Sequence, residues 1–467
     1  MLEKNAIPES RSPVRYPSRR DLFKVGACGF GHLALASLAT EAAASAKPLA
    51  PKPPHFSARA KRVIFMYMRG GPSHVDSFDY KPKLETDHGK KGKMGHNLMQ
   101  ARWKFHRRGE SGLWISELFP HLARRADELC VIRSMQTDSG AHPTAQPLLH
   151  TGSFQFTRPS IGSWVFYGLG AANENLPGFI TINPSRTFGG PANYGSAFLP
   201  SAYQGTRIGW EGQSLQDAQI QNLTRSDLPD NVQRKQLSLI QSMNRRLFKW
   251  SAGDSRIEGV IDSFDLAWRM REAIADALDV SRESKTTLEM YGIDQKPTDN
   301  FGRQCLMARR LCEAGVRFVE LGHGGWDQHG DIAEHQIQSQ KVDQPIAALL
   351  TDLKRRGLLE DTLLFWGGEF GRRPEIQHVN NSPGGRGHNA EGYTIWLAGG
   401  GVRGGLAYGE TDEYGYEAVS DKVHLHDLHA TMLYLLGLDH QQLTYRYAGR
   451  DFRLTDVHGH VVQGIVS

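Results

Sequence analysis

Apolar runs and turn residues alternate along most of the chain and predict a series of buried strands. The run at 62–68 is almost continuously apolar and ends at Gly70-Gly71, as is typical of a buried strand followed by a loop. Similar runs predict further strands at 129–135, 177–183, 317–321, 362–366 and 393–397. Intervening segments predict helices at 117–128, 143–151, 302–314, 338–356 and 426–436. This alternation predicts an α/β fold with a mostly parallel central sheet and helices on both faces.

One segment departs from the alternation. Residues 205–298 carry charged, Gln-rich helical patterns, such as those at 232–250 and 264–278. They predict a helical insertion within a single domain that extends over 61–460.

The first 46 residues predict an export signal. Arg19 and Arg20 precede a Gly- and Ala-rich apolar run at 25–39, and Ala44-Ser45-Ala46 offers small residues for cleavage. Paired arginines are typical of the twin-arginine class, so we expect a periplasmic or secreted protein. Residues 47–60 follow as a Pro-rich linker. No later run reaches about 18 apolar residues, so no transmembrane segment is expected in the mature chain.

Composition excludes several classes of protein. The 467 residues contain 55 Lys and Arg against 50 Asp and Glu, and no basic stripe marks a nucleic-acid partner. Of the four cysteines, Cys28 lies in the leader. The other three form no C-x-x-C pair, which argues against a disulfide scaffold or a Cys-rich zinc site. Glycine, at 50 residues, and histidine, at 20, are abundant and fall together in loops.

Five of these loops, each beside a predicted strand, combine glycine with a carboxylate, an imidazole or both. Ligands bind at the carboxyl ends of strands in open parallel sheets, so these loops are the candidate site. Carboxylates and imidazoles suit Zn²⁺, or Mn²⁺ and Ca²⁺ where oxygen ligands dominate. Such an ion polarises a phosphoryl or sulfuryl oxygen. The candidate ligands are Asp76, Asp327, His329, Glu369 and His388, with His74, Asp79, His323 and His426 as secondary candidates.

Three other residues suit roles next to a metal. Some of the candidate ligands could also be present for a purely structural reason. Arg372 suits binding of a tetrahedral oxyanion, and His142 and Thr144 follow the second predicted strand. Aspartates such as Asp76 are also typical of turns. Glu369 could also be an acidic residue at a helix N-terminus that interacts favourably with the helix dipole.

Six motifs together resemble the alkaline phosphatase–sulfatase superfamily, and most closely its exported twin-arginine, sulfatase-like branch of unassigned function. The resemblance spans about 60–460 and implies the fold of that superfamily, with two adjacent metal sites around a nucleophile. The motifs are GGPSHVDSFDYKP (70–82), ARRLCEAGVRFVE (308–320), GGWDQH (324–329), GGEFGR (367–372), AGGGVRGG (398–405) and HDLHATMLYLLGLDH (426–440).

The resemblance also implies the ligands of each metal site. One site matches Asp327, His329 and His388. The second matches Asp76 or Asp79 together with Glu369. The next residue, Phe370, stands where the family has a histidine and cannot ligate, so the second site is weak or empty. The resemblance therefore implies one or two divalent ions, with Zn first and Ca or Mn as alternatives.

The nucleophile departs most from the family pattern. Counting back from Thr151-Gly152 places His142 where sulfatases have a cysteine or serine, with Thr144 close by. The resemblance thus leaves three mechanisms open: His142 as nucleophile or base, Thr144 as nucleophile, or attack by a metal-activated water. In each of them Arg372 would hold the oxyanion.

We therefore expect an exported, metal-dependent hydrolase of sulfate or phosphate esters that lacks the usual Cys or Ser nucleophile. Its substrate would be a small-molecule or polysaccharide ester, with no nucleic acid involved. The alternative is a catalytically inactive metal-binding or assembly protein on the same fold, which Phe370 and the missing hydroxyl or thiol at position 142 favour. A phosphoryl-transfer mutase is a weaker third reading.

Overall fold

A mixed sheet forms the centre of the computed structural model, which describes residues 49–216, 228–251 and 254–467. Within these residues the sheet has nine strands, in the order β12-β4-β11-β8-β1-β7-β5-β6, with β15 also pairing with β4. All neighbours are parallel except β11, which runs antiparallel to both β4 and β8. The strands are β1 (Arg62–Met68), β4 (Leu129–Gln136), β5 (Phe179–Ile182), β6 (Thr206–Ile208), β7 (Phe318–His323), β8 (Thr362–Gly367), β11 (Tyr393–Ala398), β12 (Leu406–Tyr408) and β15 (Val423–His424).

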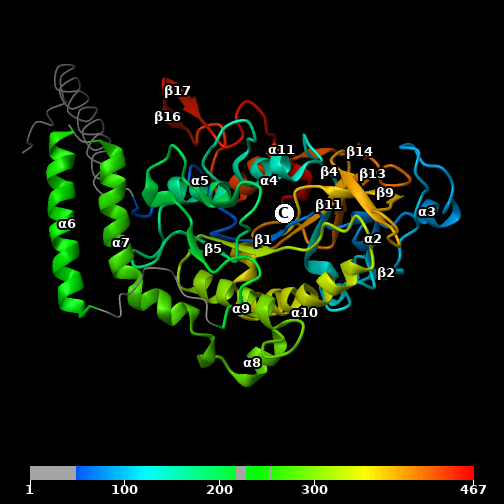
Figure 1. Ribbon diagram of the computed structural model, residues 1–467, viewed down its shortest axis with the longest axis horizontal. Helices are drawn as coiled ribbons and strands as arrows, with labels where there is room; N and C mark the ends of the chain where they lie inside the picture. Colours follow the sequence, from blue (N-terminus) through cyan, green and yellow to red (C-terminus); the bar gives the residue numbers. More distant parts are fainter. Residues whose placement is uncertain (1–48, 217–227, 252–253) are drawn as a thin grey trace, which may run out of the picture. The chain divides into compact units, whose positions relative to one another are not determined.

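Helices cover both faces of this sheet, as predicted (Figure 1). Successive side chains of a strand point to opposite faces. Ile64 and Met66 of β1 therefore join the core under one helical layer, while Phe65 stacks on Phe365 at 4.1 Å and contacts the other. The first layer contains α9 (Asp299–Glu313) and α10 (Glu334–Arg355), and the second contains α4 (His142–Thr151), α5 (Ile161–Leu169) and α11 (Leu425–Leu435).

The predicted helix at 117–128 is wrong in its extent. Only Leu122–Glu128 is helical, as the 3₁₀ helix η1, and it follows strand β3 (Leu113–Ser116). Pro120 explains the difference, because proline disfavours helical geometry in the residue before it and removes a backbone donor. The helices predicted at 143–151, 302–314, 338–356 and 426–436 correspond to α4, α9, α10 and α11.

Short paired strands outside the central sheet were not predicted. One of these hairpins, β9 with β10, places His388 opposite Arg372 in its register. It therefore brings two sequence-predicted site residues together. Within the described residues the pairs are β2 (Phe105–Arg108) with β3, β9 (Gly371–Gln377) with β10 (Gly385–Asn389), β13 (Glu410–Thr411) with β14 (Ala418–Ser420), and β16 (Tyr445–Tyr447) with β17 (Arg450–Phe452).

The segment predicted as a helical insertion begins with a strand. β6 is the edge strand of the central sheet, so the helices of this segment come after it. They are α6 (Asp230–Trp250), α7 (Ser255–Leu278) and α8 (Lys285–Met290). α6 packs against α7, and α7 contacts α9.

The predicted export signal, with Arg19 and Arg20, lies outside the described residues. Part of the predicted linker is described and is hydrogen-bonded to the domain. The Lys52 amide donates to Leu169 O, and the amides of Arg59 and Ala60 donate to Leu435 O. Among the described residues, none of the helices combines the length and the hydrophobicity that spanning a membrane requires.

Replacing Ile64 by Val tests the position of β1 at the middle of the core. Ile64 is fully buried, so the lost methylene should lower the free energy of unfolding by about 0.5–1.5 kcal/mol. Urea unfolding measures this change. As a control, Val419→Ala on the exposed strand β14 should change stability by less than about 0.5 kcal/mol. Equal effects of the two substitutions would contradict this placement.

Candidate metal centre

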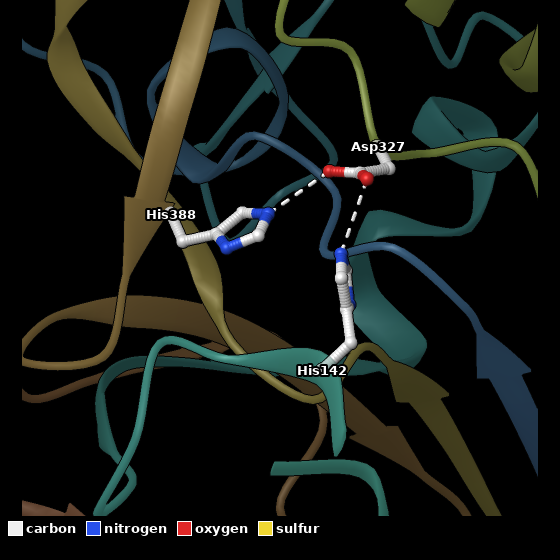
Figure 2. A group of neighbouring side chains, drawn as sticks. All are labelled: His142, Asp327 and His388. Atoms are coloured by element: carbon white, nitrogen blue, oxygen red, sulfur yellow. Dashed lines mark hydrogen bonds and ion pairs between the residues drawn. The ribbon is translucent and has the colours of Figure 1, made fainter. Parts of the chain in front are cut away.

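Four loops and strand ends bring the candidate residues to one edge of the sheet. Asp327 and His329 follow β7, and Glu369 follows β8. His142 is the first residue of α4, just after β4, and His388 lies in β10. Figure 2 shows the Asp327 carboxylate between the His142 and His388 rings. The carboxyl ends of the strands therefore carry the cluster, as expected for a parallel sheet.

Three imidazoles of this cluster are each fixed through the Nδ1 atom. In every case the partner is an oxygen that accepts a hydrogen bond, so Nδ1 is the donor and a neutral ring has its lone pair on Nε2. The pairs are His142 with Glu369 Oε1 at 2.7 Å, His329 with Gln377 Oε1 at 2.8 Å, and His388 with Gly140 O at 2.6 Å.

The three Nε2 atoms converge on the Asp327 carboxylate. Oδ1 lies 2.9 Å from His388 Nε2 and 3.0 Å from His329 Nε2, and these two nitrogens are 2.9 Å apart. His142 Nε2 lies 3.1 Å from Oδ2, but it is buried and has no hydrogen-bond partner of suitable geometry. Four ligands held tetrahedrally by one Zn²⁺, at about 2.0–2.1 Å each, are about 3.3 Å apart. The donor atoms of Asp327, His329 and His388 are thus spaced about as in a zinc site, and those of His142, Asp327 and His388 lie within 4.8 Å of one another.

Two carboxylates and three imidazoles determine the electrostatics of the cluster. Burial alone would lower the pKa of His142, but the adjacent carboxylates of Asp327 and Glu369 raise it to about 9. Burial likewise opposes the shift of Asp327, whose pKa is held well below its usual range by the three histidines. The two carboxylates thus favour a positive charge between them, which a divalent cation would supply in place of a proton on His142. The side chain of Asp327 is 39 % exposed, so the cluster has an open side.

Glu369 lies behind His142 instead of at the point of convergence. Its side chain is fully buried and accepts from the Gly70 amide at 3.1 Å and from Gln146 Nε2 at 3.2 Å, besides His142. A carboxylate on the far nitrogen of a histidine fixes the ring and makes it a stronger ligand. The sequence predicted Glu369 as a ligand, whereas the structure places it as support for His142.

Arg372 is fully buried, and all of its nitrogens are engaged by the protein. Its guanidinium therefore joins the loops after β1, β7 and β8 to the β10 strand and leaves no nitrogen free for the predicted oxyanion. It donates through Nε to Gly71 O at 2.9 Å, through Nη1 to Arg386 O at 3.0 Å, and through Nη2 to Trp326 O at 3.2 Å, to Gly70 O and to Asp327 Oδ1.

Gly70 lets this loop approach the cluster. Its φ is +115°, and an added Cβ would lie only 2.6 Å from the Asp327 backbone nitrogen. Any other residue would be strained and would displace Asp327. The paired glycines after β1 thus serve the close approach of two loops.

Two phenylalanines pack against the ligand rings. Phe370 is buried, with its ring centre 4.3 Å from that of His388 and 4.9 Å from that of His142. Phe188 stacks on His142 at 5.5 Å and is exposed. Sequence reasoning missed Phe188, although Gly189-Gly190 beside it marks a loop after β5. It also missed Gln377, which no motif distinguishes.

Asp76, predicted as a ligand of a second ion, lies in a buried ion pair. Its carboxylate is 2.6 Å from Arg386 Nε and also accepts from the Ser73 hydroxyl and, at 3.1 Å, from the Arg102 amide. Arg386 precedes His388 by two residues in β10, so the pair anchors the strand that carries a metal-ligand candidate.

The remaining predicted residues lie in other networks. Thr144 is half-buried in the first turn of α4, two residues after His142. The four secondary candidates have the following partners: His74 contacts Gly415 O at 2.9 Å, Asp79 pairs with Lys81 at 3.1 Å, His323 accepts from Trp326 Nε1 at 3.1 Å, and His426 contacts Gly152 O at 3.0 Å.

Replacing Asp76 by Asn tests whether this residue supports the fold or binds an ion. Arg386 would be left as a buried, uncompensated charge, so the free energy of unfolding should fall by about 3–5 kcal/mol. The bound-metal stoichiometry of the folded protein should not change. Denaturant unfolding and metal analysis measure the two effects. Asp451→Asn, which breaks an exposed pair with Arg446, should cost about 1 kcal/mol or less. Loss of an ion in Asp76→Asn would restore Asp76 as a ligand.

Comparisons with solved structures give distant likenesses. PsFucS1 sulfatase from Pseudoalteromonas sp. is 13% identical, with a TM-score of 0.37, over 81% of this chain and 68% of that chain. The lipoteichoic acid synthase LtaP from Listeria monocytogenes is 9% identical, with a TM-score of 0.37, over 91% and 82%. Alkaline phosphatase from the Antarctic bacterium TAB5 is 10% identical, with a TM-score of 0.31, over 81% and 98%. These similarities to solved structures are too low to assign roles to residues of this chain.

No curated protein matches the chain. A family model does match, over residues 60–466, and its description is "Protein of unknown function (DUF1501)". The match covers nearly the whole described domain, and the chain therefore belongs to the DUF1501 family.

Proposed function

We propose that the chain binds one divalent cation through His142, His329, His388 and Asp327. The observation that carries this proposal is the convergence of three Nε2 atoms, each on a ring fixed through Nδ1, on one carboxylate. The buried Nε2 of His142, which has no hydrogen-bond partner, fits a metal ligand. Three imidazoles and one carboxylate favour Zn²⁺ over Ca²⁺ or Mn²⁺, which prefer oxygen.

We infer that this centre serves hydrolysis of sulfate or phosphate esters, as the sequence motifs suggest. A bound cation would polarise an ester oxygen and activate water. Glu369 and Phe370 hold the His142 ring, and Arg372 holds the Asp327 carboxylate. These residues therefore fix the donors before a substrate arrives, which lowers the cost of reorganisation. The open side at Asp327 is where an ester would approach.

Cysteine chemistry does not fit this centre. The three cysteines among the described residues are buried and free. Burial raises the pKa of Cys130 and Cys312 to about 12, so these thiols stay protonated and unreactive. Thr144 stays a candidate nucleophile by its place in α4. Water is the nucleophile that we favour, because His142 is a ligand in this proposal and its ring is then not available to attack the ester.

A metal-binding protein without hydrolysis is the second candidate. Phe370 fills the space beside His142 and His388 with a side chain that cannot ligate, so the cluster holds donors for one ion. The nitrogens of Arg372 are all engaged by backbone carbonyls and Asp327, so they are not offered to an oxyanion. Both features favour binding or assembly over catalysis.

Export belongs to the same proposal. Arg19, Arg20 and the apolar run at 25–39 support twin-arginine transport to the periplasm or beyond the cell. That route carries folded proteins, which suits a protein that takes up its metal before export. A small-molecule or polysaccharide ester outside the cytoplasm would then be the substrate.

Metal analysis of histidine variants tests the ligand set. His329→Ala and His388→Ala should each lower metal affinity and reduce the metal retained per chain, as measured by elemental mass spectrometry. His378→Ala is the matched control, since His378 is an exposed histidine close to the cluster in sequence. Unchanged metal content in both ligand variants would show that the assignment is wrong.

Glu369→Gln separates a supporting residue from a ligand. If Glu369 only orients His142, the variant should bind the same number of ions with affinity lowered about 10–100-fold. Calorimetric titration with Zn²⁺ gives both quantities. A drop from two ions to one would instead make Glu369 a ligand of a second site.

Panels of aryl sulfates and aryl phosphates decide between the two candidate functions. The Zn²⁺-loaded protein should hydrolyse one class of ester, and chelation or His142→Ala should abolish turnover, because the donor set is then incomplete. The His378→Ala variant should keep full activity. Stoichiometric metal without turnover of any ester would favour the binding protein.

A further inference from the structure

The helix α6 presents a row of large apolar side chains to solvent. Trp250 is 85% exposed and Met243 62%, which is unusual for such residues. Residues spaced three and four apart lie on one helix face, so these side chains form a single stripe. We call it the α6 stripe, and it consists of Leu239, Ile240, Met243, Leu247 and Trp250.

Another face of α6 attaches the helix to the protein. Gln241 is buried there, and its amide donates to Ile261 O and to Asp265 Oδ1 of α7, both at 2.8 Å. The α6 stripe therefore points away from the contacts that hold the helix. An exposed apolar patch of this kind marks a surface that contacts another protein or a membrane.

Charge on α6 narrows the choice of partner. The helix contains five basic residues, all exposed, and one acidic residue, Asp230, which is paired with Arg271 at 2.8 Å. Two of the basic residues are sequence neighbours of stripe residues: Arg246 precedes Leu247, and Lys249 precedes Trp250. The basic residues are Arg234, Lys235, Arg245, Arg246 and Lys249. The partner must therefore be both apolar and negatively charged.

We propose that α6 docks the protein on the surface of a membrane that contains anionic lipid. The α6 stripe would enter the boundary between headgroups and acyl chains. Tryptophan rings such as that of Trp250 are enriched at this boundary because they are amphipathic. The basic residues would contact the lipid phosphates. A second copy of the chain is disfavoured as partner, because it would bring an equally basic helix against this one.

Vesicle binding of the purified full chain tests this surface. We expect co-sedimentation with vesicles of phosphatidylglycerol and phosphatidylcholine, weak binding to phosphatidylcholine alone, and a decrease with added salt. A Met243→Ser, Leu247→Ser double variant should bind at least tenfold more weakly. Arg245→Glu with Arg246→Glu should do the same, since each basic residue contributes roughly fivefold.

Two controls assign the effect to α6 and not to another part of the chain. Val419→Ser removes an exposed apolar side chain elsewhere and should bind like the unaltered protein. Brominated lipids quench tryptophans that lie in the membrane. The emission of Trp250 is the difference in fluorescence between the unaltered protein and Trp250→Phe, and brominated vesicles should quench it. Circular dichroism checks that each variant is folded.

Three results would overturn the proposal. The first is no preference for anionic vesicles in the unaltered protein. The second is equal binding by the α6 variants together with an unquenched Trp250 difference. The third is a dimer by size-exclusion chromatography that the Met243→Ser, Leu247→Ser variant dissociates, without vesicle binding, which would mean that a second copy covers the stripe.

Discussion

The buried guanidinium of Arg372 is the contact on which the candidate centre depends. A buried cation is tolerated when it is paired and hydrogen-bonded, and here the acceptors are the carbonyls of Gly70, Gly71, Trp326 and Arg386, together with the Asp327 carboxylate. These acceptors lie in three segments that are far apart in the sequence: the loop after β1, the loop after β7 and strand β10. Their relative positions are therefore fixed by one side chain, and the three histidines are placed against a carboxylate that cannot turn away.

Around that anchor the protein supports each ligand through a second contact. The imidazoles are fixed on the side away from Asp327, by Glu369, Gln377 and Gly140. Phe370 packs on two of the rings. The buried Asp76–Arg386 pair anchors the strand that carries His388. Such support makes the donor set rigid before any ion binds, which is the condition for selective binding of a small cation.

The sequence predicts the sheet and the identity of the converging residues better than their roles. Apolar runs identify the strands because burial on both faces leaves no polar alternation, but the same runs do not show that β11 is antiparallel. Glycine next to acid or imidazole identified Asp327, His329, His388 and His142. It could not show that Asp76 has a buried arginine as partner, because that partner is 310 residues away. Residues that act through shape or amide contacts, such as Phe188 and Gln377, have no motif.

Glu369 adds a consequence for the charge of the centre. Asp327 and Glu369 contribute two negative charges and Arg372 one positive charge, while the three imidazoles are neutral as ligands. With a divalent cation bound, these groups together would carry one net positive charge in a partly buried site. Counted over these groups, the charge of the centre would balance one negative charge. A sulfate monoester, which carries one negative charge, would be neutralised there, whereas the dianion of a phosphate monoester would need a further positive group from the substrate or from solvent.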